Sequence, residues 1–217
     1  MKYLAIASMM LALSACDNSV NEYSVTVTNL THSQPLSPPA AMLHKSTFSA
    51  WTVGMAASDQ LEQLAEGGDS SGLLSLQPDS VSYSADAPLL SGESINFSLI
   101  SRKRSHTHLT LAGMLVNTND AFSGINAMEL DELESGHTRV VYSYALDAGT
   151  EANSELAGTI PGPADGGEGF NVSRDDVTSV VTHHGGIVSQ DDGNAGSVLT
   201  EAHRFDGPVL RIEITAM

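Results

Sequence analysis

Hydrophobic and polar residues alternate along several short segments of this chain, as they do in β-strands with one buried face. The first such segment is Tyr-Ser-Val-Thr-Val-Thr at residues 23–28. Similar patterns predict further strands at 80–84, 93–101, 107–116, 138–146, 177–182 and 208–215. Segments rich in glycine, proline, aspartate and asparagine lie between the strands, and they predict loops at 29–39, 86–91, 117–124 and 159–169.

A helical pattern stands out in one segment, at residues 58–66. Leu61, Leu64 and Ala65 share one face there, because they are spaced at i, i+3 and i+4. Ser58 is a suitable N-cap, and the glycines at 67–68 provide a stop. Many short strands with one minor helix predict an all-β fold, built as an antiparallel β-sandwich.

The N-terminal segment has a different character. Lys2 precedes an apolar run at 4–13 that is too short to span a membrane but suits an export signal. The run leads into Leu-Ser-Ala-Cys at 13–16, and Cys16 is the only cysteine of the chain. This segment resembles the lipobox of bacterial lipoproteins, which implies cleavage before Cys16 and acylation of its thiol and new amine. A plain signal peptide with an incidental cysteine is the alternative.

These features divide the chain into three parts. We expect a lipoprotein signal peptide at 1–15, a lipidated tether at 16–22 and one folded domain at 23–217. The lipid would anchor the protein to a membrane of the bacterial cell envelope, facing the periplasm or the surface.

Nine Lys and Arg against 26 Asp and Glu give a formal charge of −17, which argues against nucleic acid as a partner. The acidic surplus favours solubility and is compatible with cation binding.

Three predicted loops are acidic enough to hold a cation: 117–124, 147–153 and 190–194. In the second loop, Gly149 lets the chain turn between Asp147 and Glu151, so the two carboxylates can converge. Ca²⁺ takes six to eight oxygen ligands, which carboxylates, amides and backbone carbonyls supply. Acidic connections between strands are also common without any metal, so the composition alone leaves both interpretations open.

The chain from Tyr23 onward resembles the spondin N-terminal domain, which occurs in F-spondin and mindin and as a standalone module in bacteria. The resemblance rests on the order and spacing of several short motifs and on a proline-rich loop before His44. The motifs lie at 23–31 (YSVTVTNLT), 65–69 (AEGGD), 119–124 (NDAFSG), 147–151 (DAGTE) and 160–163 (IPGP).

This resemblance implies an eight-stranded antiparallel β-sandwich like a C2 domain, with Ca²⁺ held among loops at one edge. It assigns Asp120 to the calcium site from one loop, and Asp147 and Glu151 from the next. Animal relatives usually carry a second aspartate where Glu151 stands, and a glutamate can still chelate. The chain lacks the cysteines and the tryptophan of the animal members, so their integrin and matrix partners are not transferred to it.

Few other residues are candidates for metal binding or catalysis. His106 and His108 would share one face of a strand and could bind zinc or copper with a third ligand, or simply occupy a strand surface. Motifs of serine hydrolases, zinc proteases and phosphate-binding loops are absent from the sequence. Asp147 and Glu151 could act as a glycosidase pair. Aromatic residues are scarce, however, and we expect Phe48 and Trp51 to pack in the core.

The sequence therefore predicts a non-enzymatic Ca²⁺-binding envelope lipoprotein whose β-sandwich serves adhesion or contact with an unidentified protein or matrix partner. Two alternatives remain at this point. One is a structural envelope protein that binds no metal. The other is a periplasmic hydrolase that uses the acidic loops.

Overall fold

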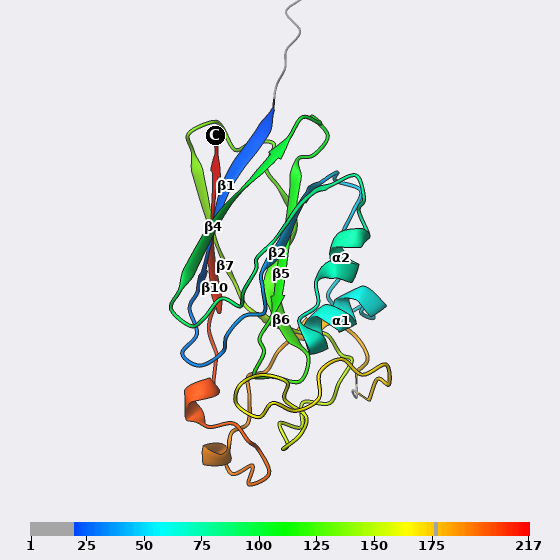
Figure 1. Ribbon diagram of the computed structural model, residues 1–217, viewed down its shortest axis with the longest axis vertical. Helices are drawn as coiled ribbons and strands as arrows, with labels where there is room; N and C mark the ends of the chain where they lie inside the picture. The colour runs from blue at the N-terminus through cyan, green and yellow to red at the C-terminus, as the bar shows by residue number, and fades with distance from the viewer. Residues whose placement is uncertain (1–19, 176–177) are drawn as a thin grey trace, which may run out of the picture.

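Two antiparallel β-sheets pack face to face in the computed structural model, which describes residues 20–175 and 178–217 (Figure 1). The predicted all-β sandwich is confirmed. The strand order is β4-β1-β10-β7 in one sheet and β3-β2-β5-β6-β8-β9 in the other. The first sheet consists of β1 (Asn21–Asn29), β4 (Ser94–Ser101), β7 (Thr138–Ser143) and β10 (Leu210–Ala216). The second consists of β2 (Ala40–His44), β3 (Val81–Ser84), β5 (His108–Met114), β6 (Ala121–Glu129), β8 (Ala145–Asp147) and β9 (Thr182–His183).

The described strands exceed the eight that the resemblance implied, because the six-stranded sheet is extended by two very short strands. β8 has three residues and β9 has two. Both lie at the edge beyond β6, so they add little to the core. They bring the segment around 147 beside the start of β6, and the segment around 183 beside β8.

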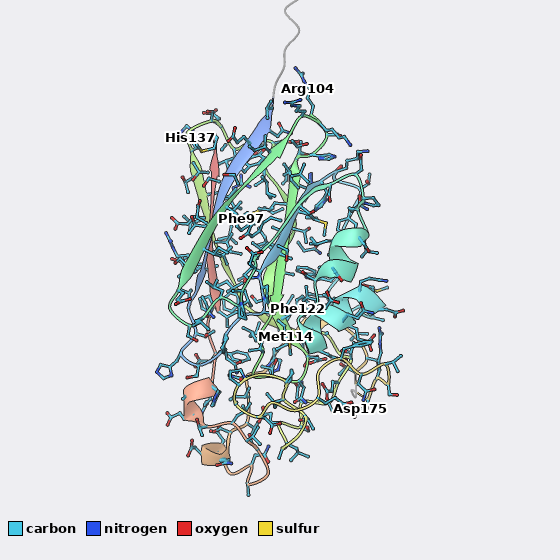
Figure 2. All side chains as sticks on the ribbon, in the orientation of Figure 1. Phe97, Arg104, Met114, Phe122, His137 and Asp175 are labelled. Atoms are coloured by element: carbon cyan, nitrogen blue, oxygen red, sulfur yellow. The ribbon has the colours of Figure 1, made fainter. Side chains whose placement is uncertain are left out.

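The core between the sheets follows the alternation seen in the sequence. On β1, Val25 and Val27 are fully buried, while Thr26 between them lies on the outer face. Leu109 and Leu111 of β5 reach the same core from the other sheet. Phe97, also in this core, lies between the two sheets in Figure 2. Burial of alternate residues on each inner face is the arrangement expected of a β-sandwich.

Two helices, α1 (Asp59–Gly67) and α2 (Ser71–Ser75), cover the outer face of the six-stranded sheet (Figure 1). The helix predicted at 58–66 is confirmed. The Ser58 side chain accepts a hydrogen bond from the Leu61 N–H at 3.2 Å, and Gly68 ends the helix with a left-handed φ of 70°. Leu61 and Leu64 pack on Phe122 of β6 in a second hydrophobic core. The middle of the six-stranded sheet, formed by β2, β5 and the start of β6, is therefore buried on both faces. Two 3₁₀ turns, η1 (Gln190–Asp192) and η2 (Glu201–His203), lie in the C-terminal loops.

The second core explains where the sequence predictions were wrong. Residues 117–124 were expected to be a loop, but β6 begins at Ala121, and Gly124 lies within it. A Cβ on Gly124 would lie 1.8 Å from the Leu111 carbonyl oxygen, so this glycine permits close strand approach rather than a turn. β2 was not predicted, because it is buried on both faces and shows no alternation. The strand predicted at 177–182 is also wrong for residues 178–181, since only Thr182–His183 forms a strand there.

The predicted signal peptide, with Cys16 and most of the tether, lies outside the described residues. β1 begins at Asn21, two residues before the expected start of the domain. Among the residues that the structure describes, no helix has the length and apolar character needed to cross a membrane.

Candidate cation site

Asp120, Asp147 and the backbone of Glu151 lie near one another at one edge of the six-stranded sheet. Antiparallel pairing of β6 with β8 sets Ala121 opposite Asp147, so the start of one strand lies beside the end of the other. The loop after β8 then turns back toward Asp120. The Thr150 N–H donates to Asp120 Oδ2 at 2.8 Å, and the Glu151 N–H donates to the same oxygen at 3.2 Å. The proximity predicted for the two acidic loops is thus present in the fold.

The Asp120 carboxylate is fully buried and only half satisfied. Its Oδ2 accepts the two backbone hydrogen bonds and one from the Thr150 hydroxyl, at 3.3 Å, whereas its Oδ1 has no hydrogen-bond partner. Burial, followed by the charge of Asp147, raises the pKa of Asp120 to about 7, although the hydrogen bonds act in the opposite direction. A buried carboxylate with an open oxygen is costly unless a proton or a cation joins it.

The Asp147 carboxylate has protein partners at both oxygens. Its Oδ1 accepts from the Gly149 N–H at 2.7 Å, and its Oδ2 accepts from Asn153 Nδ2 at 2.5 Å. Gly149 has a left-handed φ of 69°, and a Cβ there would lie 2.4 Å from the Val180 carbonyl oxygen. This turn therefore requires glycine, as the sequence indicated.

Glu151 is the most strongly perturbed acid of the group. Burial raises its pKa to about 8, and the charge of Glu66 is the next largest cause. The charges of Asp120 and Asp175 raise this pKa as well, while a hydrogen bond with the Asn119 side chain lowers it. Asp175 lies among the loops below α1 in Figure 2. Glu151 therefore lies within a larger acidic cluster than the sequence predicted.

Two carboxylates of this cluster were missed, and both come from α1. Glu62 and Glu66 have only 3% and 1% of their surface exposed, and each has one oxygen, Oε1, without a hydrogen-bond partner. Glu62 Oε2 accepts from Arg174 Nε at 2.8 Å, and Glu66 Oε2 accepts from the Asn171 N–H at 2.9 Å. The sequence contained a signal for them. Two glutamates at i and i+4 repel each other on a helix, so such a pair indicates that a positive charge lies nearby.

The donor set suits a hard cation, but the groups are not in contact with one another. In residues 20–175 and 178–217, no three His, Cys, Asp or Glu side chains converge tightly enough to form a ready-made metal site. The three open oxygens belong to Glu62, Glu66 and Asp120. All are buried carboxylate oxygens, the ligand type that Ca²⁺ prefers. A cation could therefore be held here only if the carboxylates move toward it.

The other candidates from the sequence lie apart from this cluster. The acidic loop at 190–194 uses its carboxylates internally: Asp192 accepts from the Ser189 N–H and Oγ, and Asp191 accepts from the Glu201 N–H. His106 was expected on a strand surface but is buried before β5, where its Nδ1 lies 3.0 Å from Ser101 Oγ. A buried, hydrogen-bonded imidazole of this kind stabilises the local turn.

Comparison with models of known protein families found no match to this chain, and a search among curated proteins found no relative. The functional argument therefore depends on the residues of the site and on the motifs of the sequence.

Proposed function

We propose that this protein is a non-enzymatic, Ca²⁺-binding lipoprotein of the bacterial cell envelope, which uses its β-sandwich for adhesion or for contact with another protein. The observation that carries the calcium proposal is the buried Asp120 carboxylate, whose Oδ1 has no partner while Asp147 and Glu151 lie close by. None of the ion pairs formed by the described residues involves Asp120, Asp147 or Glu151, and a bound cation would supply positive charge at this edge.

Calcium chemistry accounts for this arrangement better than a purely structural role does. A divalent cation would replace the protons that the raised pKa values of Asp120 and Glu151 indicate, and it would join the β5–β6 connection to the loop after β8. Asp120, Asp147 and Glu151 would hold the ion. Extracellular modules bind Ca²⁺ with dissociation constants of about 10⁻⁴ to 10⁻³ M. At the tighter value and about 1 mM free ion, binding would add about 1.4 kcal/mol to the free energy of unfolding.

The placement of the site supports presentation away from a membrane. The first described strand, β1, begins at the end of the sandwich opposite the loops that follow β8 (Figure 1). An acylated Cys16 would attach the chain to lipid near the start of β1. The loops of the cation site would then face outward, where a partner could reach them. This orientation rests on the lipobox resemblance.

The calcium proposal is tested with the full chain, expressed with its N-terminal segment and purified in detergent. We expect 1 mM Ca²⁺ to raise the melting temperature by about 3–6 °C over a chelator control. An equal melting temperature in both conditions would instead support the structural, metal-free alternative. Mass spectrometry of the N-terminal peptide tests lipidation separately, since an acylated Cys16 carries the mass of its fatty acids.

The hydrolase alternative has less support, although the raised pKa values of Asp120 and Glu151 would also suit a general acid. Trp51 packs edge-on against Phe122 with ring centroids 5.1 Å apart, so it contributes to the second core rather than to an open sugar-binding surface.

A further inference from the structure

We propose that Glu66 of α1 is a direct ligand of the same cation, so that the bound ion ties α1 to the β6–β8 edge of the sheet. This inference rests on the proposed calcium function, but it concerns a residue that neither the loop pattern nor the family resemblance assigned to the site. The ion would then also hold α1 in place over the second hydrophobic core, which α1 covers.

The first observation is the position of Glu66 within its helix. Glu66 lies in the last turn of α1, where the unpaired carbonyl groups create a partial negative charge. That turn contains no basic residue. A buried carboxylate at this end of a helix is unfavourable twice, through its own desolvation and through the helix dipole. Burial indeed raises the pKa of Glu66, and the charge of Glu62 raises it further.

The second observation is the open Oε1 of Glu66, a buried oxygen without a hydrogen-bond partner. Its other oxygen, Oε2, is used by the Asn171 N–H. Glu62, one turn earlier, differs because the Arg174 guanidinium compensates its charge. Glu66 therefore has the free lone pairs of a ligand and lacks a comparable ion pair.

The third observation connects Glu66 to Asp120 and Glu151. Ala65, the residue before Glu66, packs in the second core together with Ala148, which follows Asp147, and with Phe122, two residues after Asp120. In the same loop, the Thr150 hydroxyl donates to Asp120 Oδ2 at 3.3 Å. Among the charges that raise the pKa of Glu151, that of Glu66 has the largest effect. Glu66 thus faces the same loop as the predicted ligands. A divalent cation between these carboxylates would offset two of their three negative charges and would accept oxygen ligands from all three.

The competing explanation is a proton. Glu66 could remain protonated, which would also lower the cost of its burial without any ion. Exchange of Glu66 for glutamine separates these explanations. Glutamine resembles the protonated acid in shape and hydrogen bonding, but it lacks the charge that a calcium ligand contributes.

The test uses the full chain in detergent and compares Glu66→Gln with Asp59→Asn, which also removes one negative charge from α1 but at an exposed side chain. In a calorimetric titration with CaCl₂, we expect Glu66→Gln to weaken binding by about 10-fold or more, as loss of a ligand should cost at least what loss of an outer-shell partner does. Asp59→Asn should stay within about twofold of the wild type, because exposed charges are screened. Hydrogen exchange supplies a second readout: Ca²⁺ should slow the exchange of the α1 amides in the wild type but not in Glu66→Gln.

The outcomes separate the two levels of the argument. If the wild type binds no Ca²⁺, the calcium function itself fails. If the wild type binds Ca²⁺ and Glu66→Gln binds it equally well, with the same protection of α1, the function stands and the role of Glu66 is overturned. Circular dichroism checks the folding of Glu66→Gln. If this variant does not fold, Glu66→Asp tests the same point, since it keeps the charge but withdraws the carboxylate by one methylene and should also weaken binding.

Discussion

Glu155 and Asp120 are two buried carboxylates on neighbouring loops, and their surroundings differ in one decisive respect. Glu155 receives hydrogen bonds at both oxygens from the Val188 N–H, at 2.7 and 3.0 Å, and Oε2 also accepts from Ser197 Oγ. Asp120 has one satisfied oxygen and one open oxygen. Burial raises the pKa of both groups. The comparison teaches that burial alone does not distinguish the two groups, and that the proposed cation site rests on the open buried oxygen of Asp120 beside other acids.

The largest expected change in the free energy of unfolding is at Glu155, the carboxylate that needs no ion. Glu155→Ala would leave the Val188 N–H without its acceptor inside the C-terminal loops, so we expect the free energy of unfolding to fall by about 2 kcal/mol. Chemical denaturation measures this loss. The loss should be the same in Ca²⁺ and in chelator. A loss that appears only in Ca²⁺ would place Glu155 in the cation site and remove the contrast.

A smaller effect is expected for Asp120→Asn. This change keeps an acceptor for the Thr150 and Glu151 N–H groups but removes the charge, so we expect the calcium increment of about 1.4 kcal/mol to disappear. Without calcium, the variant should be at least as stable as the wild type, because it no longer buries a carboxylate. Thermal unfolding of both proteins, each with Ca²⁺ and with chelator, gives the four values required. A calcium increment that persists in Asp120→Asn would contradict this assignment.

A further expected effect is a dependence of the calcium-free stability on pH. The folded-state pKa values of Asp120 and Glu151, about 7 and about 8, lie above the ordinary values of 3.8 and 4.5. Between these limits the folded state holds more protons than the unfolded state. The contribution of the two groups to stability is therefore complete below the ordinary values and is lost as pH rises through 7 and 8.

The stability that calcium adds depends on pH with the opposite sign, because the ion binds the deprotonated carboxylates. We expect the increase of melting temperature caused by 1 mM Ca²⁺ to be larger near pH 8 than near pH 6. Asp120→Asn with Glu151→Gln is the control, and it should remove this pH dependence. An increment that is equal at both pH values would show that protons and calcium do not compete at these residues.

The four-stranded sheet could be predicted from the sequence because one of its faces is open to water. β1, β4 and β10 alternate visibly for that reason. β2 and β6 could not be predicted, since α1 and α2 cover the face that would otherwise carry polar residues. Alternation of hydrophobic and polar residues depends on one face of a strand being exposed to water, and it disappears where both faces are buried.

Residue patterns alone made the candidate site predictable only as far as it is local, and Asp120 was added by the family resemblance. Asp147 and Glu151 share one short loop, and the Gly149 between them indicated that the loop turns. Glu66 lies 85 residues before Glu151, and no local pattern connects them. Their proximity arises from the packing of α1 on the six-stranded sheet. The open oxygen of Asp120 likewise depends on which N–H groups the folded loop directs toward it.

The most direct test of the central claim is a calorimetric titration of the calcium-free full chain with CaCl₂ at pH 7.5. The account predicts saturable binding with a dissociation constant of about 10⁻⁴ to 10⁻³ M. The same titration of Asp120→Asn should give no binding in this range, while Glu155→Gln should bind like the wild type. Absence of binding to the wild type, or undiminished binding to Asp120→Asn, would contradict the account.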